Sequence, residues 1–224
     1  MPDDHPPQAE GTPRYVPAAG RAGLTRFYDA GVRLTMREPL WRSLIVDAIA
    51  DKAPKTVVDV GCGTGALSIP IAARLPKARV IGIDGDPQVL NIARGKPGAE
   101  AVEWREGLAG ALPIEDSEID VVVTSLVLHH LPLATKRELL ADAHRVLRPG
   151  GRLIVADWAA PQDLVASAGF VLLQVLDGFA TTNDNRRGLI PRLIVQAGFP
   201  EPRLLRRVRT ALGTFDVLVI DLPR

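Results

Sequence analysis

The sequence predicts an α/β fold in which helices cover both faces of a parallel sheet. Residues 53–158 alternate strand-like apolar runs with helix-like runs, the pattern of such a sheet. The first strand-like run breaks into a turn of closely spaced glycines, and a helix-like run from Ala66 to Leu75 follows at once. At 224 residues, the chain is long enough for one domain with one large core.

The expected elements begin with two helices in residues 21–52, placed around Pro39. Pro70 falls in the opening turn of the first crossover helix, where a missing N–H costs little. Asp86, directly before Pro87, is the expected N-cap of the next helix. Strands are expected near residues 55–60, 79–84, 101–105, 119–124 and 152–157.

The last part of the chain gives a weaker pattern. Leu164–Leu176 is apolar almost all round and, at 13 residues, too short to span a bilayer. This run is compatible with a helix buried in the core, and also with a substrate lid or a dimer face. A helix over 186–198 that ends at Gly198, and strands near 203–210 and 215–221, are expected to complete the fold.

These patterns divide the chain into an arm and a single domain. Residues 1–20 contain five prolines and little to bury, so they are expected to form a disordered N-terminal arm. Residues 21–224 then form the domain. It consists of an N-terminal helical cap (21–52), a cofactor-binding core (53–158), and a lid segment with the final strands (159–224).

Composition narrows the class of protein. The formal net charge of +1 gives no general attraction to nucleic acid or to acidic membranes. The four arginines in residues 203–209 are expected to form a solvated face rather than an RNA site. A single cysteine, Cys62, excludes an internal disulfide framework and a cysteine-based metal site. The N-terminus lacks the regions of a signal peptide, which predicts a cytoplasmic protein.

The glycine turn is the clearest candidate binding site. Gly61, Gly63 and Gly65 leave room for a ligand to lie against backbone N–H groups. The spacing also fits a dinucleotide site, with Asp84 as the acid that binds ribose. Asp59 favours another ligand, because a carboxylate there would repel a pyrophosphate but attract the ammonium and sulfonium groups of S-adenosylmethionine. A glycine turn without any ligand is the remaining alternative.

Four segments in order carry a family resemblance: 59–65 (DVGCGTG), 80–87 (VIGIDGDP), 119–131 (IDVVVTSLVLHHL) and 147–158 (LRPGGRLIVADW). Over about residues 53–158 the chain resembles the class I S-adenosylmethionine-dependent methyltransferases. It is most similar to their small-molecule branch, which includes the quinone-biosynthesis C-methyltransferases. The resemblance implies a Rossmann-like three-layer sandwich with a seven-stranded, mostly parallel sheet and an antiparallel C-terminal strand. It also implies S-adenosyl-L-methionine as cofactor and S-adenosyl-L-homocysteine as product.

The resemblance also assigns cofactor-binding residues. Asp84 is expected to accept hydrogen bonds from the ribose hydroxyls, and Ser125 and Leu126 to lie beside the methionine moiety. Leu108 stands where the family often has an aspartate, so only the backbone of Gly107 and Leu108 can reach adenine. Tyr28 is expected to reach the cofactor carboxylate or the acceptor. The full expected set is Tyr28, Asp59, Gly61, Cys62, Gly63, Gly65, Asp84, Gly85, Gly107, Leu108, Ser125 and Leu126.

Catalysis is expected to need few residues. Methyl transfer is an in-line displacement, so the enzyme chiefly aligns the reactants and excludes water. Of the adjacent His129 and His130, His130 is the candidate general base, because an imidazole titrates near neutrality. In the alternative interpretation His130 packs or orients its loop. No metal site is expected.

The predicted function is therefore S-adenosylmethionine-dependent O- or C-methylation of a hydrophobic small-molecule acceptor. The alternatives are an NAD-type Rossmann oxidoreductase and a non-catalytic relative that binds S-adenosylmethionine. Neither a nucleic-acid partner nor a membrane span is expected, and a homodimer is left open.

Overall fold

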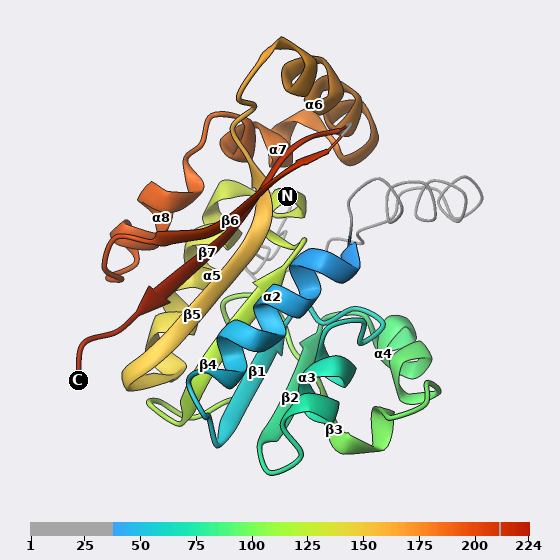
Figure 1. Cartoon of the computed structure of the whole chain (residues 1–224), viewed down its shortest axis with the longest axis vertical. Helices are drawn as coiled ribbons and strands as arrows, with labels where there is room; N and C mark the ends of the chain where they lie inside the picture. Colours follow the sequence, from blue (N-terminus) through green and yellow to red (C-terminus); the bar gives the residue numbers. More distant parts are fainter. Residues whose placement is uncertain (1–37, 211) are drawn as a thin grey trace, which may run out of the picture.

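The computed structural model describes residues 38–210 and 212–224. They form one seven-stranded sheet in the order β3-β2-β1-β4-β5-β7-β6, with helices on both faces (Figure 1). The strands are β1 (Thr56–Val60), β2 (Arg79–Asp84), β3 (Val102–Glu106), β4 (Ile119–Ser125), β5 (Leu147–Ala159), β6 (Arg203–Thr210) and β7 (Gly213–Asp221). Strands β1 to β5 pair in parallel, and β7 runs antiparallel between β5 and β6.

The helices are α2 (Glu38–Ala50), α3 (Ser68–Arg74), α4 (Pro87–Arg94), α5 (Leu133–Val146), α6 (Leu164–Asp177), α7 (Phe179–Arg186) and α8 (Ile190–Gln196). Two 3-10 turns, η1 (Ala99–Ala101) and η2 (Leu128–His130), complete the described elements. Figure 1 places α6 and α7 together above one end of the sheet. Within the described part of the chain, no helix is both long and apolar enough to cross a lipid bilayer.

Two hydrophobic cores form because the strands carry apolar side chains on both faces. One core joins α2 and α3 to alternate residues of the strands, with Trp41 and Phe215 fully buried at its centre. The other joins α5 and α8 to the opposite residues, such as Val58 and Val122. The continuous apolar runs in β1 and β4 follow from this burial on both sides.

The predicted fold class is confirmed, including the antiparallel C-terminal strand. The N-cap at Asp86 is also confirmed, because its side chain accepts from the backbone N–H of Gln88 at 2.8 Å. Residues 1–37 lie outside the described residues, so the disordered arm, the first cap helix and Tyr28 stay predictions.

Two local predictions are wrong. The helix expected over 186–198 is divided into the end of α7 and the separate helix α8. Gly188 takes a left-handed φ of 69° between them, and Pro191 stands in the first turn of α8. The alternation of strand and helix also fails once, since residues 107–118, all within the described range, connect β3 to β4 without an α-helix.

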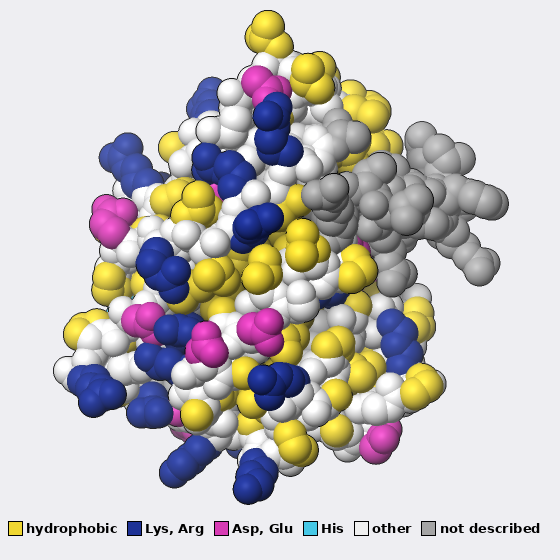
Figure 2. Space-filling view, in the orientation of Figure 1, with side chains coloured by type: hydrophobic (Ala, Val, Ile, Leu, Met, Phe, Trp, Pro, Cys, Tyr) yellow, Lys and Arg dark blue, Asp and Glu magenta, His cyan; other side chains and the backbone are white. Residues whose placement is uncertain are grey.

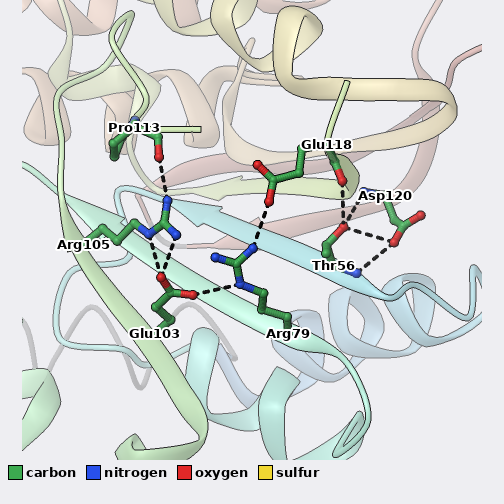
Figure 3. A network of polar contacts seen from close by, with 7 residues as sticks. All are labelled: Thr56, Arg79, Glu103, Arg105, Pro113, Glu118 and Asp120. Carbon is green, nitrogen blue, oxygen red and sulfur yellow. Dashed lines mark hydrogen bonds and ion pairs between the residues drawn. The ribbon is translucent and has the colours of Figure 1, made fainter. Parts of the chain in front are cut away.

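The amino-terminal edge of the sheet is held by a polar network (Figure 3). An Asp120 oxygen accepts hydrogen bonds from the backbone N–H groups of Lys55 and Thr56, at 2.7 and 2.8 Å. Arg79 of β2 bridges Glu103 of β3 and Glu118, the residue before β4. These contacts join four strands at the edge opposite the glycine turn, so the carboxyl ends of the strands are free for a binding site.

Candidate active site

The glycine turn lies at the carboxyl end of β1 and is tied to the neighbouring strand. The N–H groups of Gly61 and Cys62 both donate to the carbonyl oxygen of Ile83, at 2.8 and 3.0 Å. The turn therefore sits beside Asp84, the last residue of β2, as the sequence predicts.

The three glycines of the turn have different surroundings. A Cβ on Gly65 would lie 2.5 Å from the ring of Trp104, and one on Gly61 would lie 2.4 Å from Val127. These two glycines allow close packing. A Cβ on Gly63 would meet no atom within 4 Å, so this residue borders open space. Gly63 is therefore the point at which a ligand can approach the turn.

Asp84 organises this opening. One carboxylate oxygen accepts from the N–H of Gly63 at 2.8 Å, and the other accepts from the N–H of Asp86 at 3.0 Å. A carboxylate offers about four acceptor positions, so each oxygen keeps one for a further donor. Two neighbouring hydroxyl groups, such as those of a ribose, match this remaining capacity.

Asp59 supplies a second, buried carboxylate behind the turn. One oxygen accepts from the Ser68 hydroxyl at 2.5 Å, and the other has no hydrogen-bond partner among the described residues. Burial raises the pKa of Asp59 to about 6, and the Asp84 carboxylate adds to this effect, while Ser68 and Arg42 oppose it. An unsatisfied buried carboxylate suits a cation and disfavours a pyrophosphate.

The remaining residues predicted to bind the cofactor also lie at the glycine turn or at the ends of the strands. The Cys62 thiol is buried, which raises its pKa and leaves the sulfur unreactive. Gly85 follows Asp84 in a bend. Gly107 donates to the carbonyl of Asp84 at 3.1 Å, and a Cβ there would lie 2.8 Å from Pro113. Leu108 is half-buried in an isolated bridge with Ala111.

The loop after β4 connects this half to a second group of polar residues. Ser125 ends β4, and Leu126 adopts a left-handed φ of 58°, which is strained for a leucine. The Leu126 N–H donates to the carbonyl of Ala156 at 2.9 Å. Val127, next in the loop, packs against Gly61. The loop therefore carries the two histidines of η2 to the edge of the glycine turn.

His129 forms a buried dyad with Asp157, at the carboxyl ends of β4 and β5. Its Nδ1 lies 2.8 Å from Asp157 Oδ1. When the ring is neutral, this contact favours the proton on Nδ1 and leaves Nε2 as an acceptor. Asp157 also accepts from the backbone N–H groups of Val127, Leu128 and Trp158. Although burial opposes it, the charge and hydrogen bond of His129 hold the pKa of Asp157 below its usual value.

His130 stacks on this dyad but has a different electrostatic environment. The two imidazole centroids are 3.9 Å apart. Burial lowers the pKa of His130 to about 3, and repulsion from the neighbouring His129 ring when it is protonated adds to this shift. This shift makes His130 a poor base near neutral pH, and its assignment as general base stays a prediction.

Helices α6 and α7 also contribute residues that contact the dyad. Asp177, the last residue of α6, has Oδ2 at 3.8 Å from His129 Nε2. Asn185 of α7 donates to the carbonyl of Trp158 at 2.9 Å and to Asp157 at 3.3 Å. Lys136 of α5 is fully buried and holds α7 through the carbonyl of Thr181 and the carboxylate of Asp184, at 2.6 and 3.1 Å.

A cavity of about 180 Å³ lies behind the dyad, between β5, β7 and the connection from α7 to α8. Asp157 and Asn185 line it, together with the ion pair of Arg207 and Asp216. Both carboxylate oxygens of Asp216 are bound by Arg207 at 2.7 Å. The polar lining is thus largely paired. Asp157 and Asp216 are neighbours on the paired strands β5 and β7, so the cavity lies where the dyad meets the final hairpin.

Sequence reasoning missed the dyad and its neighbours. Asp157 was visible as the polar residue that ends an apolar strand, but nothing in its spacing paired it with His129. Asp177 and Asn185 carried no signal, because they come from segments far along the chain. The structure brings these residues together beside His130.

Comparison with known proteins identifies the family to which the chain belongs. Residues 57–151 match the family model described as a methyltransferase domain. The chain is 34% identical over 180 residues to a demethylmenaquinone methyltransferase of Thermus thermophilus, covering 77% of this chain and 80% of that protein. It is 31% identical over 180 residues to the same-named protein of Deinococcus radiodurans, covering 77% of this chain and 73% of that protein.

Solved structures show the same fold. Human N-acetylserotonin methyltransferase, in complex with S-adenosylmethionine, superposes with a TM-score of 0.65 at 18% identity. The match covers 82% of this chain but 52% of the human one, so the chain spans about half of that larger protein. At this identity the likeness concerns the fold alone.

Proposed function

Because the chain belongs to the S-adenosylmethionine-dependent methyltransferases, with S-adenosylmethionine as its cofactor, we propose that it methylates a hydrophobic small molecule carrying an aromatic hydroxyl group. The acceptor would lie beside the His129–Asp157 dyad, at the carboxyl ends of β4 and β5. The observation that carries this proposal is a buried imidazole whose Nδ1 is held by a carboxylate and whose Nε2 is an acceptor.

In the proposed reaction His129 acts as general base. The acceptor hydroxyl gives its proton to Nε2, and the Asp157 carboxylate stabilises the imidazolium that forms. The Asp177 carboxylate, 3.8 Å from Nε2, adds a second negative charge. The resulting phenolate can react at its oxygen or at a conjugated ring carbon, so one base serves O- and C-methylation.

The cofactor residues prepare the other reactant. When bound, S-adenosylmethionine supplies an electrophilic methyl group on a sulfonium that already carries the leaving-group charge. Asp84 and the Gly63 N–H hold the ribose side of the opening, and Asp59 offers negative charge toward the cationic end. Val127 joins the turn to the histidine loop, which keeps the two reactants aligned.

The acceptor class is supported by chemistry and by similarity. A buried dyad next to the largely apolar helix α6 suits a ligand that is mostly apolar with one polar group. The relatives at 34% and 31% identity are named for methylation of demethylmenaquinone, an acceptor of this chemical kind.

The test is a methylation screen with the full chain and methyl-labelled S-adenosylmethionine. The acceptors are phenols and short-chain quinols, with tRNA and a lysine-rich protein as competitors, and products are located by mass spectrometry and NMR. We expect label on a phenol or quinol. His144→Gln, at a histidine that packs against Phe199 away from the site, is the matched control and keeps activity. Robust label on tRNA or protein, with none on any small acceptor, contradicts the proposal.

A further inference from the structure

Helix α6 turns a continuous apolar face outward. Six of its residues are large, apolar and substantially exposed: Leu164, Val165, Val171, Leu172, Val175 and Leu176. Leu164, Val165 and Val175 have exposed fractions of 88%, 75% and 64%. Their spacing places them on one side of the helix, and Phe179, the first residue of α7, extends the row at 55% exposure. We refer to these seven residues as the α6 stripe.

The opposite side of α6 is fixed to the protein. Phe170 and Leu173 are buried in the core that contains Phe215, and Gln174 is buried against Arg186. The sequence left open whether this helix lies in the core, forms a lid or faces a partner. The structure shows a helix that is half in the core and half exposed, so the buried-helix interpretation is correct for one side only.

An exposed apolar surface of this size is typical of a site that binds another molecule. No charged residue occurs between Leu164 and Leu176, and the stripe covers about four helical turns, or roughly 20 Å. In Figure 2, hydrophobic side chains reach the surface at the top of the molecule, where Figure 1 shows α6. Contiguous apolar patches of this kind mark contacts with proteins or membranes.

The charges beside the stripe favour a membrane. The Arg186 guanidinium donates to Gln174 Oε1 at 2.7 Å and forms no ion pair with a carboxylate among the described residues. Arg187, next in the chain, is exposed. Helix α6 itself carries no basic residue, and the positive charge next to it comes from the end of α7. An apolar helix face flanked by basic groups is the pattern that lies in the interface of a bilayer containing anionic lipid.

We propose that the α6 stripe docks onto the surface of a bilayer that contains anionic phospholipid. The helix lies along the interface with its apolar side chains below the headgroups, and Arg186 pairs with a phosphate. It does not cross the bilayer, since it is far too short.

The docked helix would also deliver the acceptor, a consequence that rests on the proposed function. Leu176 and Phe179 flank Asp177, whose carboxylate lies 3.8 Å from His129 Nε2. The stripe therefore ends at the dyad. An apolar acceptor dissolved in the bilayer could move along α6 to the base without crossing water.

The test is flotation of the full chain with phosphatidylcholine vesicles, with and without phosphatidylglycerol. We expect the wild type to float with the anionic vesicles. Leu172→Glu/Val175→Glu places two charges in the stripe and should weaken binding by roughly tenfold or more. Ile92→Glu is the matched control, because Ile92 of α4 is 55% exposed but lies outside the stripe. Arg186→Gln should weaken binding to anionic vesicles by about fivefold and leave binding to neutral vesicles unchanged.

Three further measurements make the outcome unambiguous. Thermal melting of each variant checks that it folds, which exposed positions should allow. Sedimentation without vesicles tests for a second copy on the stripe. A dimer that Leu172→Glu/Val175→Glu dissociates, or wild-type chain that ignores anionic vesicles, overturns the proposal. Turnover on a short-chain phenol in water is independent of docking, so its absence in a chain that floats counts against the proposed function alone.

Discussion

The two halves of the proposed active site, one for the cofactor and one for the acceptor, are built in different ways. The cofactor half, at the ends of β1 and β2, is held by backbone N–H groups of one continuous turn and by Asp84. The acceptor half joins His129, Asp157, Asp177 and Asn185, which come from four separate segments. One half is local in the sequence, and the other exists only after folding.

The two halves therefore suit different tasks, cofactor binding at the turn and proton removal at the dyad. The turn presents backbone groups and two carboxylates, which suit recognition of a fixed cofactor. The dyad presents an acceptor nitrogen in a buried setting, which suits removal of a proton. Val127 contacts Gly61 and donates to Asp157, so a single loop residue connects the two halves. Substitutions at the dyad should therefore lower turnover with little effect on cofactor affinity, and substitutions at the turn should lower cofactor affinity.

The largest expected effect is on the acceptor half. His129→Ala should lower kcat by roughly 10²–10⁴ because the general base is lost, while affinity for S-adenosylhomocysteine stays near wild type. His130→Ala is the matched comparison and should cost far less, since the low pKa of His130 makes it a weak base. Steady-state kinetics with calorimetric titration checks both. If both variants lose kcat to the same extent, the loss comes from a changed loop conformation and His129 is not the general base.

The next effect belongs to the cofactor half. Asp84→Ala removes the acceptors for two hydroxyl groups and for the Gly63 N–H, so affinity for S-adenosylhomocysteine should fall by roughly 10- to 100-fold. Asp86→Ala removes the N-cap of α4 and should reduce stability by about 1 kcal/mol with unchanged affinity. Calorimetric titration and thermal melting separate the two. Wild-type affinity in Asp84→Ala would refute the ribose assignment.

A smaller effect distinguishes two glycines within the same turn. Gly63 and Gly65 both have positive φ, so an alanine at either costs about 1–2 kcal/mol of strain. Gly65→Ala also forces a Cβ to within 2.5 Å of Trp104, which should cost about 1–3 kcal/mol more. Denaturant unfolding measures the difference. If Gly63→Ala is the less stable variant, the close contact of a Cβ at position 65 with Trp104 does not determine the free energy of unfolding.

The smallest effect is a dependence of cofactor affinity on pH. Ionised Asp59 favours a bound cation, and its pKa of about 6 means that it takes up a proton as the pH falls below 6. Affinity for S-adenosylhomocysteine should therefore decrease below pH 6, by at most about tenfold per pH unit. Asp59→Asn should lack this decrease. Calorimetric titrations between pH 5 and 8 provide the check, and a parallel decrease in both proteins would exclude Asp59 as its source.

What the sequence revealed follows the same division. The strand β6 was predicted at its observed bounds, and the glycine turn with Asp84 was predicted as a unit, because hydrophobic periodicity and short motifs are local. The pairing of His129 with Asp157 depends on the register of β4 beside β5. The low pKa of His130 depends on burial that only the folded chain provides. Neither property is encoded within a short stretch, so neither could be read before the fold was known.

The buried Cys62 gives this protein a practical advantage for spectroscopy. It is the only cysteine in the sequence, and burial raises the pKa of its thiol and keeps it from reagents. A cysteine introduced at an exposed position would therefore be the single thiol that a fluorophore or spin label can modify. Placed at Leu172, such a label would report the polarity around α6 in real time, without first removing a native residue from the glycine turn.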